Sequence, residues 1–301
     1  MAEPQHVPVL LEESLEYLNV RPGGVVVDAT LGFAGHSSAI ARKLGAKGRL
    51  ICFDRDEQAM AKAKARLEAL AEELGAESEG GMPTVEYVAR PFSEIAEVIR
   101  PGELDGLLAD FGVSSMQLGE AHRGFSFRAE GPLDMRMDPR SELTAEQVVN
   151  QADEEDLANL IYEFGEERRS RRIARAVVRA RPISTTAELA RVISAVAPSM
   201  KGDKIHPATR TFQALRIRVN DELGEIQSLL KSAGSLLKPG GRVVLISFHS
   251  LEDRLVKDSF RASAKAGVLK ILTKKPVVAK EQEALRNPRS RSAKLRAAEK
   301  V

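Results

Sequence analysis

Two aspartates that follow apolar segments are the residues of this chain best suited to chemistry. The run Val25–Asp28 ends in an acid, passes through a turn of small residues and enters a helical pattern. A doubly wound α/β protein forms its ligand crevice in this way, at the carboxyl end of its first strand. A second apolar run ends in Asp54, at the position where an acid accepts hydrogen bonds from ribose hydroxyls. Together Asp28 and Asp54 predict a site for an adenosine-containing cofactor.

The sequence of the turn narrows the kind of cofactor. From Gly32 to Ser37 it reads G-F-A-G-H-S, which lacks the G-x-G-x-x-G pattern of dinucleotide sites, and no phosphate-binding G-x-x-x-x-G-K-[ST] loop occurs. S-adenosylmethionine carries no phosphate, and its amino-acid tail suits backbone N–H groups beside an acid such as Asp28. A single glycine-rich turn also occurs where a strand merely joins a helix, and this alternative stays open.

Composition excludes several classes of protein. The chain has 301 residues, enough for two modest domains, and its 45 basic and 43 acidic side chains leave a net charge of +2 that indicates no partner. One cysteine excludes a disulfide framework, and scattered histidines predict no metal site. Glu12, Glu13 and Glu16 stand where a signal peptide needs an apolar core. No apolar run can span a bilayer, so a cytoplasmic protein without membrane contact is predicted.

Apolar segments alternate with helical patterns near the start of the chain and resume near its end. The predicted strands are Val25–Asp28, Leu50–Asp54, Val85–Ala89, Leu104–Asp110 and Arg242–Phe248, with helices at Ser37–Leu44 and Glu57–Leu74. This alternation predicts an α/β fold with a doubly wound parallel sheet covered on both faces. Val268–Thr273 and Lys294–Ala298 are predicted to form a closing β-pair.

The interval between the fourth and fifth strands is far longer than one crossover helix requires. Capping-box patterns at Thr144–Gln147 and Thr185–Glu188 indicate helix starts there, and Asp153 is a further candidate cap. We therefore predict an all-helical domain inserted at 127–206, which leaves 1–126 and 207–301 to the α/β domain. The segment Leu236–Gly241 is predicted to turn the chain back into the sheet.

A series of segments, in consistent order along the chain, resembles the RsmH (MraW) family of bacterial 16S rRNA (cytosine-N4)-methyltransferases. They are His6–Leu10, Asp28–Ser37, Phe53–Asp56, Asp110–Leu118, Arg123–Phe127, Gly131–Asp138, His206–Arg216, Ser247–Arg254 and Asn287–Arg296. The resemblance implies a class I (Rossmann-like) methyltransferase sheet with an inserted helical domain. It also implies S-adenosyl-L-methionine as cofactor and methyl transfer to a cytidine N4 in 16S rRNA of the small ribosomal subunit.

The resemblance further implies which residues contact the cofactor. They are Ala34, Gly35, His36, Asp54, Phe92, Asp110 and Gln117. Two residues depart from the usual family pattern: Ala34 stands in place of a glycine, and Phe111 in place of a leucine. An alanine is accommodated at little cost if its φ is negative, and Phe111 is expected to change the packing beside the substrate crevice.

The predicted reaction needs hydrogen-bond acceptors beside the sulfonium. Methyl transfer is an in-line displacement in which positioning supplies much of the acceleration. The amino nitrogen of cytosine is a poor nucleophile because its lone pair is delocalised into the ring, and acceptors for its N–H groups improve it. Candidates at the end of the fourth strand are Asp110, Ser114, Ser115 and backbone carbonyls. The alternative for Asp110 is a strand-end turn or cap.

Other acids and a histidine are candidates for handling the proton that is released. Asp134 and Asp138 can accept it, or can form salt bridges with Arg136 or Arg128. Ser247-Phe248-His249 lacks the G-x-S-x-G pattern of a hydrolase. We interpret Ser250–Asp253 as a helix cap and His249 as a residue that can face the base.

Two helical patterns have polar faces. In Glu166–Arg181, Arg168, Arg172, Arg175 and Arg179 share a face that can neutralise phosphates, or that is solvated and paired with Glu163, Glu166 and Glu167. In His206–Glu222, the residues left for substrate or solvent are Arg210, Gln213, Arg216 and Asn220. Phe125 and Phe127 are the candidates for stacking on bases.

Two other functions stay open. An NAD-dependent dehydrogenase would share the strand-end acids, although the turn and the lack of a second nucleotide-binding half disfavour it. A non-catalytic RNA-binding assembly factor that retains a cofactor fold would share every motif. The sequence leaves the oligomeric state open between monomer and dimer.

Overall fold

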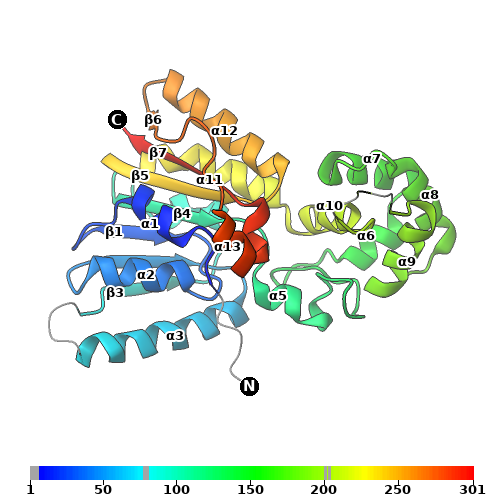
Figure 1. Ribbon diagram of the computed structural model, residues 1–301, viewed down its shortest axis with the longest axis horizontal. Coiled ribbons are helices and arrows are strands. Elements are labelled where there is room, and N and C mark those ends of the chain that lie inside the picture. Colours follow the sequence, from blue (N-terminus) through cyan, green and yellow to red (C-terminus); the bar gives the residue numbers. More distant parts are fainter. Residues whose placement is uncertain (1–6, 77–80, 200–201, 203–204) are drawn as a thin grey trace. The chain divides into compact units, whose positions relative to one another are not determined.

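The computed structural model describes residues 7–76, 81–199, 202 and 205–301 (Figure 1), so His6 lies outside the described residues. Contacts divide the chain into two compact units, one formed by Met1–Gly112 with Leu223–Val301 and the other by Val113–Glu222. Within the described residues, every helix is too short or too polar to cross a membrane.

The first unit is built on a seven-stranded sheet. Its elements are α1 (Leu11–Leu18), β1 (Val25–Asp28), α2 (Gly35–Leu44), β2 (Arg49–Phe53), α3 (Glu57–Ala76), β3 (Thr84–Val88), η1 (Phe92–Glu94), α4 (Ile95–Val98), β4 (Leu104–Asp110), α11 (Glu222–Leu236), β5 (Leu237–Ser247), α12 (Ser250–Lys265), β6 (Leu269–Ile271), α13 (Glu281–Arg286), η3 (Pro288–Ser292) and β7 (Lys294–Lys300). The strand order is β3-β2-β1-β4-β5-β7-β6. Strands β1 to β5 pair in parallel, and β7 is antiparallel to both β5 and β6. This topology confirms the predicted doubly wound fold and the closing β-pair.

Alternation along the buried strands gives the sheet two apolar faces. Val26 and Leu50 pack in one cluster with residues of α1, α2 and α3. Val27 and Ile51, their neighbours in sequence, pack in a second cluster with residues of α4, α11 and α12. Successive side chains of a strand point to opposite faces, so a continuous apolar run fills both. The layers of helices on the sheet are visible in Figure 1.

The predicted strand limits agree with the structure to within two residues, except at β5. The structure begins β5 at Leu237, inside the segment expected to be a turn. Leu104 of β4 pairs with Leu237, whereas Gly106 already pairs with Arg242. The expected turn is therefore a bulge in the strand. Gly240 supplies the positive φ of 76° that such an irregularity requires.

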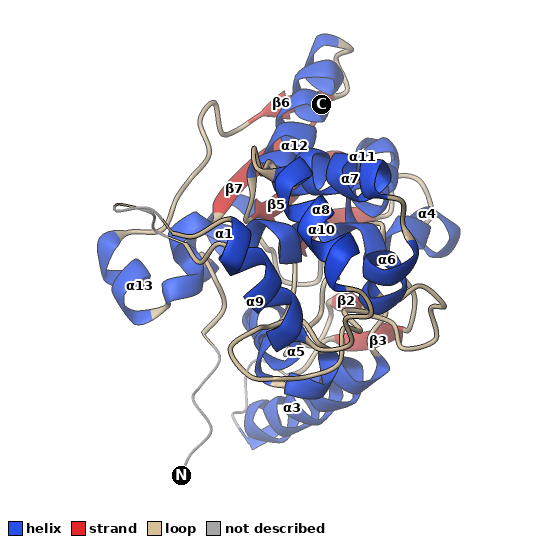
Figure 2. Ribbon diagram, turned by 90° about the vertical axis from the view of Figure 1, so that its right-hand side faces the viewer, coloured by secondary structure: helices blue, strands red, loops and turns tan. Residues whose placement is uncertain are grey.

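The second unit is helical, with no strand among its described residues (Figure 2). Its elements are α5 (Ser115–Gly119), η2 (Ala121–Arg123), α6 (Ala145–Gln151), α7 (Glu154–Gly165), α8 (Ser170–Ala180), α9 (Thr186–Val196) and α10 (Thr209–Asn220). The capping boxes predicted at Thr144 and Thr185 are both formed. Asp153 occupies the N-cap position of α7, but its side chain makes no capping hydrogen bond.

The limits of this unit differ from the predicted insertion at 127–206. Phe125 lies before that insertion, and Phe212, Leu215 and Val219 lie after it, yet all four belong to the core of the helical unit. The sequence pattern assigned α10 to the sheet domain because its apolar face fits either core. In the structure α10 packs on α7, and the compact unit runs from Val113 to Glu222.

We expect Gly165→Ala to destabilise the helical unit. A Cβ at Gly165 would lie 2.5 Å from the carbonyl oxygen of Arg210 on α10, closer than any relaxed contact. Overpacking of this kind lowers the free energy of unfolding by about 1 to 3 kcal/mol. Gly75→Ala in α3 is the control, because outside its own stretch of helix no atom of the described residues lies within 4 Å of a Cβ at this position. It should raise stability by up to about 1 kcal/mol. Differential scanning calorimetry measures both changes, and equal effects would contradict the packing argument.

Candidate functional site

Asp28 fastens the end of β1 to the turn that follows. It is 1% exposed, and its carboxylate accepts hydrogen bonds from the hydroxyl of Ser37 at 2.6 Å and the backbone N–H of Thr30 at 3.1 Å. Burial raises the pKa of Asp28, while His36 and the hydrogen bonds from Ser37 and Thr30 oppose this rise. Asp28 therefore fixes the turn to the end of β1 and to the first residues of α2.

Asp54 joins the same turn to the end of β2. Its Oδ2 accepts from the backbone N–H of Gly32 at 2.9 Å, and its Oδ1 from that of Asp56 at 2.9 Å. Burial raises the pKa of Asp54 to about 6, although both hydrogen bonds oppose this rise. An ionised carboxylate has about four lone-pair positions. Each oxygen of Asp54 thus retains capacity for another donor.

The conformation of Ala34 corrects a sequence expectation. Its φ is 56° and its ψ 28°, in the left-handed region, whereas low cost required a negative φ. This conformation costs an L-residue about 1 to 2 kcal/mol. The methyl group is fully buried, and its burial offsets part of that strain. The turn keeps the backbone of a glycine even though it carries an alanine.

His36 and Asp110 face each other from α2 and the end of β4. Nδ1 of His36 lies 3.9 Å from Oδ2 of Asp110, while its Nε2 lies 3.0 Å from the carbonyl oxygen of Val9. A carbonyl accepts but does not donate, so Nε2 carries the proton and Nδ1 is the nitrogen turned toward Asp110. The ring of His36 thus lies between the Val9 carbonyl and the carboxylate at the end of β4.

The carboxylate of Asp110 does not cap the end of its strand. Its backbone N–H donates to the hydroxyl of Thr30 at 2.6 Å, and its Oδ1 has no hydrogen-bond partner among the described residues. Burial raises the pKa of Asp110 to about 6. His36 and Arg289 lower that pKa, and Asp28 and Glu252 raise it. A buried acceptor of this kind is a candidate for binding a ligand.

The segment around Pro8 lies against this turn and is bonded to residues of α13 and just after it. A Cβ on Gly35 would lie 2.5 Å from the ring of Pro8, so only glycine allows the N-terminal segment this close. Leu10 donates its backbone N–H to Glu283 of α13 at 2.8 Å, and Asn287 donates its side-chain amide to the carbonyl of Val7 at 3.0 Å. The C-terminal segment thus holds the residues that place the Val9 carbonyl against His36.

Phe92 lies beside the residue that departs from the family pattern. Its ring centroid is 5.8 Å from that of Phe111, with the planes tilted by 41°. Phe111 is 3% exposed and Phe92 is partly buried. A leucine at position 111 would offer no ring for this contact.

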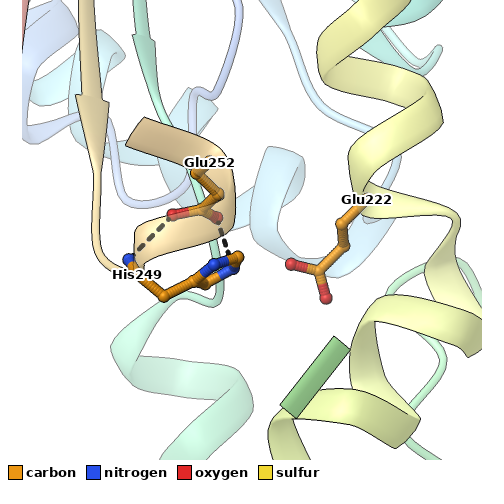
Figure 3. A group of neighbouring side chains, drawn as sticks. All are labelled: Glu222, His249 and Glu252. Atoms are coloured by element: carbon orange, nitrogen blue, oxygen red, sulfur yellow. Dashed lines mark hydrogen bonds and ion pairs between the residues drawn. The ribbon is translucent and has the colours of Figure 1, made fainter. Parts of the chain in front are cut away.

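The segment after β5 differs from the cap that the sequence suggested. Helix α12 has His249 as its N-cap residue, one position before the expected Ser250. Glu252 accepts the backbone N–H of Phe248 at 2.7 Å and of His249 at 3.2 Å. Figure 3 shows this carboxylate also facing the His249 ring, with Nε2 3.2 Å from Oε1. Ser247 donates to the Lys294 carbonyl at 3.2 Å inside the sheet, so it is not a hydrolase nucleophile.

Ser114 and Gln117, in the second unit, form a capping box for α5. Oγ of Ser114 accepts from the backbone N–H of Gln117 at 3.3 Å, and Oε1 of Gln117 accepts from that of Ser114 at 3.0 Å. Sequence reasoning missed this role, although S-x-x-Q is a capping-box pattern. The side chain of Ser115 lies outside the described part of the structure.

The two candidate proton acceptors of the second unit are ion-paired. Asp134 pairs with Arg136, with Nη2 2.7 Å from Oδ2. Burial opposes the ionised form of Asp134, but hydrogen bonds from Arg136 prevail and lower its pKa. Asp138 pairs with Arg140, with Nε 2.9 Å from Oδ1. Because Arg140 occupies the carboxylate of Asp138, the geometry argues against Asp138 as the proton acceptor.

Polar residues expected to face substrate or solvent, and aromatic residues expected to stack on bases, make contacts within the second unit. Arg210 donates to the Glu166 carbonyl and Gln213 to the Phe164 carbonyl, each at 2.9 Å. The remaining members of this set make similar internal contacts: Arg216 with Glu222, and Asn220 with Met135 and Met137. Phe125 is 7% exposed, and Phe127 packs on His206 and Phe212. Helix periodicity places these polar residues off the apolar face, but it does not show which of them bond to neighbouring segments.

Comparisons with known proteins identify the family. Residues 3–301 match the model of the MraW methylase family. The chain belongs to this family. Ribosomal RNA small subunit methyltransferase H of Acidobacterium capsulatum is 66% identical over 300 residues, which are 100% of both chains. The protein of the same name in Koribacter versatilis is 58% identical over 97% of this chain and 93% of its own. The resemblance indicated by the sequence motifs is confirmed.

We expect Asp110→Asn to change how the stability of this MraW-family protein depends on pH. The pKa of Asp110 rises from 3.8 to about 6 on folding. A raised carboxyl pKa contributes stability fully below the unfolded value, and this contribution is lost as the pH rises through the folded value. The asparagine variant, neutral throughout, should be more stable at pH 7 by up to about 3 kcal/mol, since one pKa unit corresponds to about 1.4 kcal/mol.

Urea unfolding between about pH 4 and pH 7 measures this difference. The difference in stability should narrow toward the acidic end of that range, because Asp110 is then protonated in the folded state and about half protonated in the unfolded state. Asp258→Asn, at an exposed aspartate of α12, is the control for loss of a carboxylate. A stability gap for Asp110→Asn that is the same at both pH values would contradict the prediction.

Proposed function

We propose that this protein transfers a methyl group from S-adenosyl-L-methionine to the exocyclic N4 of a cytidine in 16S rRNA of the small ribosomal subunit. The observation that carries this proposal is its full-length identity of 66% with a protein named ribosomal RNA small subunit methyltransferase H. The substrate also implies that the enzyme works in the cytoplasm. A methylase family disfavours the dehydrogenase alternative.

The residues around the first turn fit this cofactor. Asp54 retains lone pairs toward which two ribose hydroxyls can donate, beyond the N–H groups of Gly32 and Asp56. Asp110 has a buried oxygen without a partner among the described residues, which suits a cationic donor. S-adenosylmethionine supplies a methyl group on a positively charged sulfur. Two carboxylates at the strand ends therefore complement its charge.

The remaining cofactor contacts follow from the same turn. We assign Gly35 and His36 to it because they begin α2, where backbone N–H groups are not used within the helix. Ala34, whose N–H donates to the Leu31 carbonyl at 2.7 Å, enters the set through the family resemblance. Phe92, against Phe111, offers an aromatic surface for the adenine. Gln117 enters the set through the family resemblance alone.

Asp110 is the proposed acceptor in the reaction. Its ionised carboxylate would accept a hydrogen bond from the amino group of cytosine and hold the nitrogen in line for attack. As the new N–C bond forms and the C–S bond breaks, the nitrogen becomes positively charged and must lose a proton. Asp110 would take that proton and release it to water. Its pKa of about 6 keeps it ionised at neutral pH yet basic enough for this transfer. Ser114 is a secondary candidate, since it already serves as a helix cap.

We expect Asp54→Ala to weaken binding of S-adenosylmethionine by about ten- to a hundredfold. Hydrogen bonds to a charged group contribute about 1.5 to 3 kcal/mol, and the substitution removes the acceptors for the ribose. Isothermal titration calorimetry measures the affinity, with Asp258→Asn as the matched loss of an exposed aspartate. Affinity equal to that of the unaltered protein would exclude Asp54 from the site.

We expect N4-methylcytidine to form when the protein is incubated with labelled S-adenosylmethionine and small ribosomal subunits that lack the modification. Deproteinised 16S rRNA is the parallel substrate, and nucleoside mass spectrometry identifies the product. Asp110→Asn should lose at least about a hundredfold in rate, as expected when a general base is removed. Asp138→Asn, at an ion-paired aspartate, should remain active. Cofactor binding without any product would favour the non-catalytic assembly factor.

A further inference from the structure

Helix α8 carries an unusual concentration of exposed arginines. Its eleven residues, SRRIARAVVRA, contain four arginines and no acid. Arg171, Arg172, Arg175 and Arg179 are all exposed, as is Arg168 just before the helix. The apolar side is fully engaged, since Ile173 and Val177 are at most 1% exposed. The helix therefore presents to solvent a surface made of guanidinium groups.

The charges of most of these arginines do not help the helix to form; Arg179, in the last turn, is the exception. Arg171 and Arg172 lie in the first turn, which contains no acidic residue. Cations there oppose the positive end of the helix dipole. Arg171, Arg175 and Arg179 are spaced four residues apart, and like charges at this spacing each destabilise a helix by about 0.2 to 0.5 kcal/mol. Stability of the fold thus gives no reason for this pattern.

Most of these charges are also not neutralised within the protein. Arg175 lies 3.3 Å from Glu154. Among the described residues, Arg168, Arg171, Arg172 and Arg179 have no ion pair, and we call these four residues the arginine face. Glu167, a predicted partner, pairs instead with Arg169, which is outside the face.

We propose that the arginine face of α8 binds backbone phosphates of ribosomal RNA. The identity of the RNA rests on the proposed function, but the chemistry of the surface does not. Planar guanidinium groups bind phosphate oxygens in pairs, and unpaired arginines bring no competing carboxylate. Tyr162, near the end of the adjoining helix α7, is 57% exposed and offers a ring on which a base can stack.

A protein partner fits this surface less well. Stable protein interfaces have an apolar centre from which charged residues are depleted. On α8 the large apolar residues Ile173 and Val177 are buried in the core of the unit. What remains is charge without an apolar centre, and RNA is the partner with matching charge.

Binding of deproteinised 16S rRNA at several salt concentrations tests the proposal. For Arg172→Gln/Arg179→Gln we expect affinity to fall several-fold and the slope of log K against log salt to decrease by about one per arginine. Arg172→Lys/Arg179→Lys keeps the charges and should keep most of the slope. Arg261→Gln, at an exposed arginine of α12, is the control and should change the slope less. In methylation assays the glutamine variant should raise KM for RNA and leave kcat and cofactor affinity unchanged.

The proposal is overturned if the glutamine variant keeps the affinity and salt slope of the unaltered protein. It is also overturned if binding is lost for intact subunits but not for deproteinised RNA, since the surface would then contact a ribosomal protein. Because RNA binding is measured without turnover, a protein that binds RNA through α8 but forms no methylcytidine would refute the proposed function alone.

Discussion

Burial of carboxylates at the carboxyl edge of a parallel sheet is the constraint on which the rest of the first unit depends. Asp28, Asp54 and Asp110 end or follow three strands there, and burial raises the pKa of each. Removing a carboxylate from water is costly unless hydrogen bonds replace those of the solvent. Asp28 and Asp54 receive such bonds from the β1–α2 turn. The backbone of that turn, including the left-handed Ala34, is therefore fixed by the acids it surrounds.

The motifs at the two ends of the chain have a shared explanation in this arrangement. Val9 orients the ring of His36, and the segment around Val9 is held by Glu283 and Asn287 from the C-terminal part. These contacts are tertiary, and the helical or strand propensity of the two segments does not account for them. A hydrogen bond between residues more than 270 positions apart depends on the folded chain between them, because closing so long a loop costs conformational entropy. These long-range contacts explain why the N-terminal and C-terminal motifs matter although neither forms a recognisable local structure.

The helical unit uses its polar residues in two different ways. Arg210, Gln213 and Asn220 donate to carbonyls and connect α10 to neighbouring loops, because buried backbone acceptors need partners. The arginines of α8 satisfy no such need. The same residue types thus serve cohesion on one helix and form an exposed charged surface on another. The α10 residues and the arginine face differ in whether their side chains have hydrogen-bond partners within the described part of the protein.

The sequence by itself determined most of the strands and named the acids of the candidate site. Apolar runs predicted β1 and β4 to the residue, and the acids that follow such runs marked the candidate site, because hydrophobic periodicity and turn residues are local properties of a chain. The tertiary structure decided what depends on distant partners: the helical unit extending to 113–222, the pairing of Asp138 with Arg140, and His36 facing Asp110. An amphipathic helix fits more than one core, and a carboxylate is a base or half of a salt bridge depending on which side chains folding brings beside it.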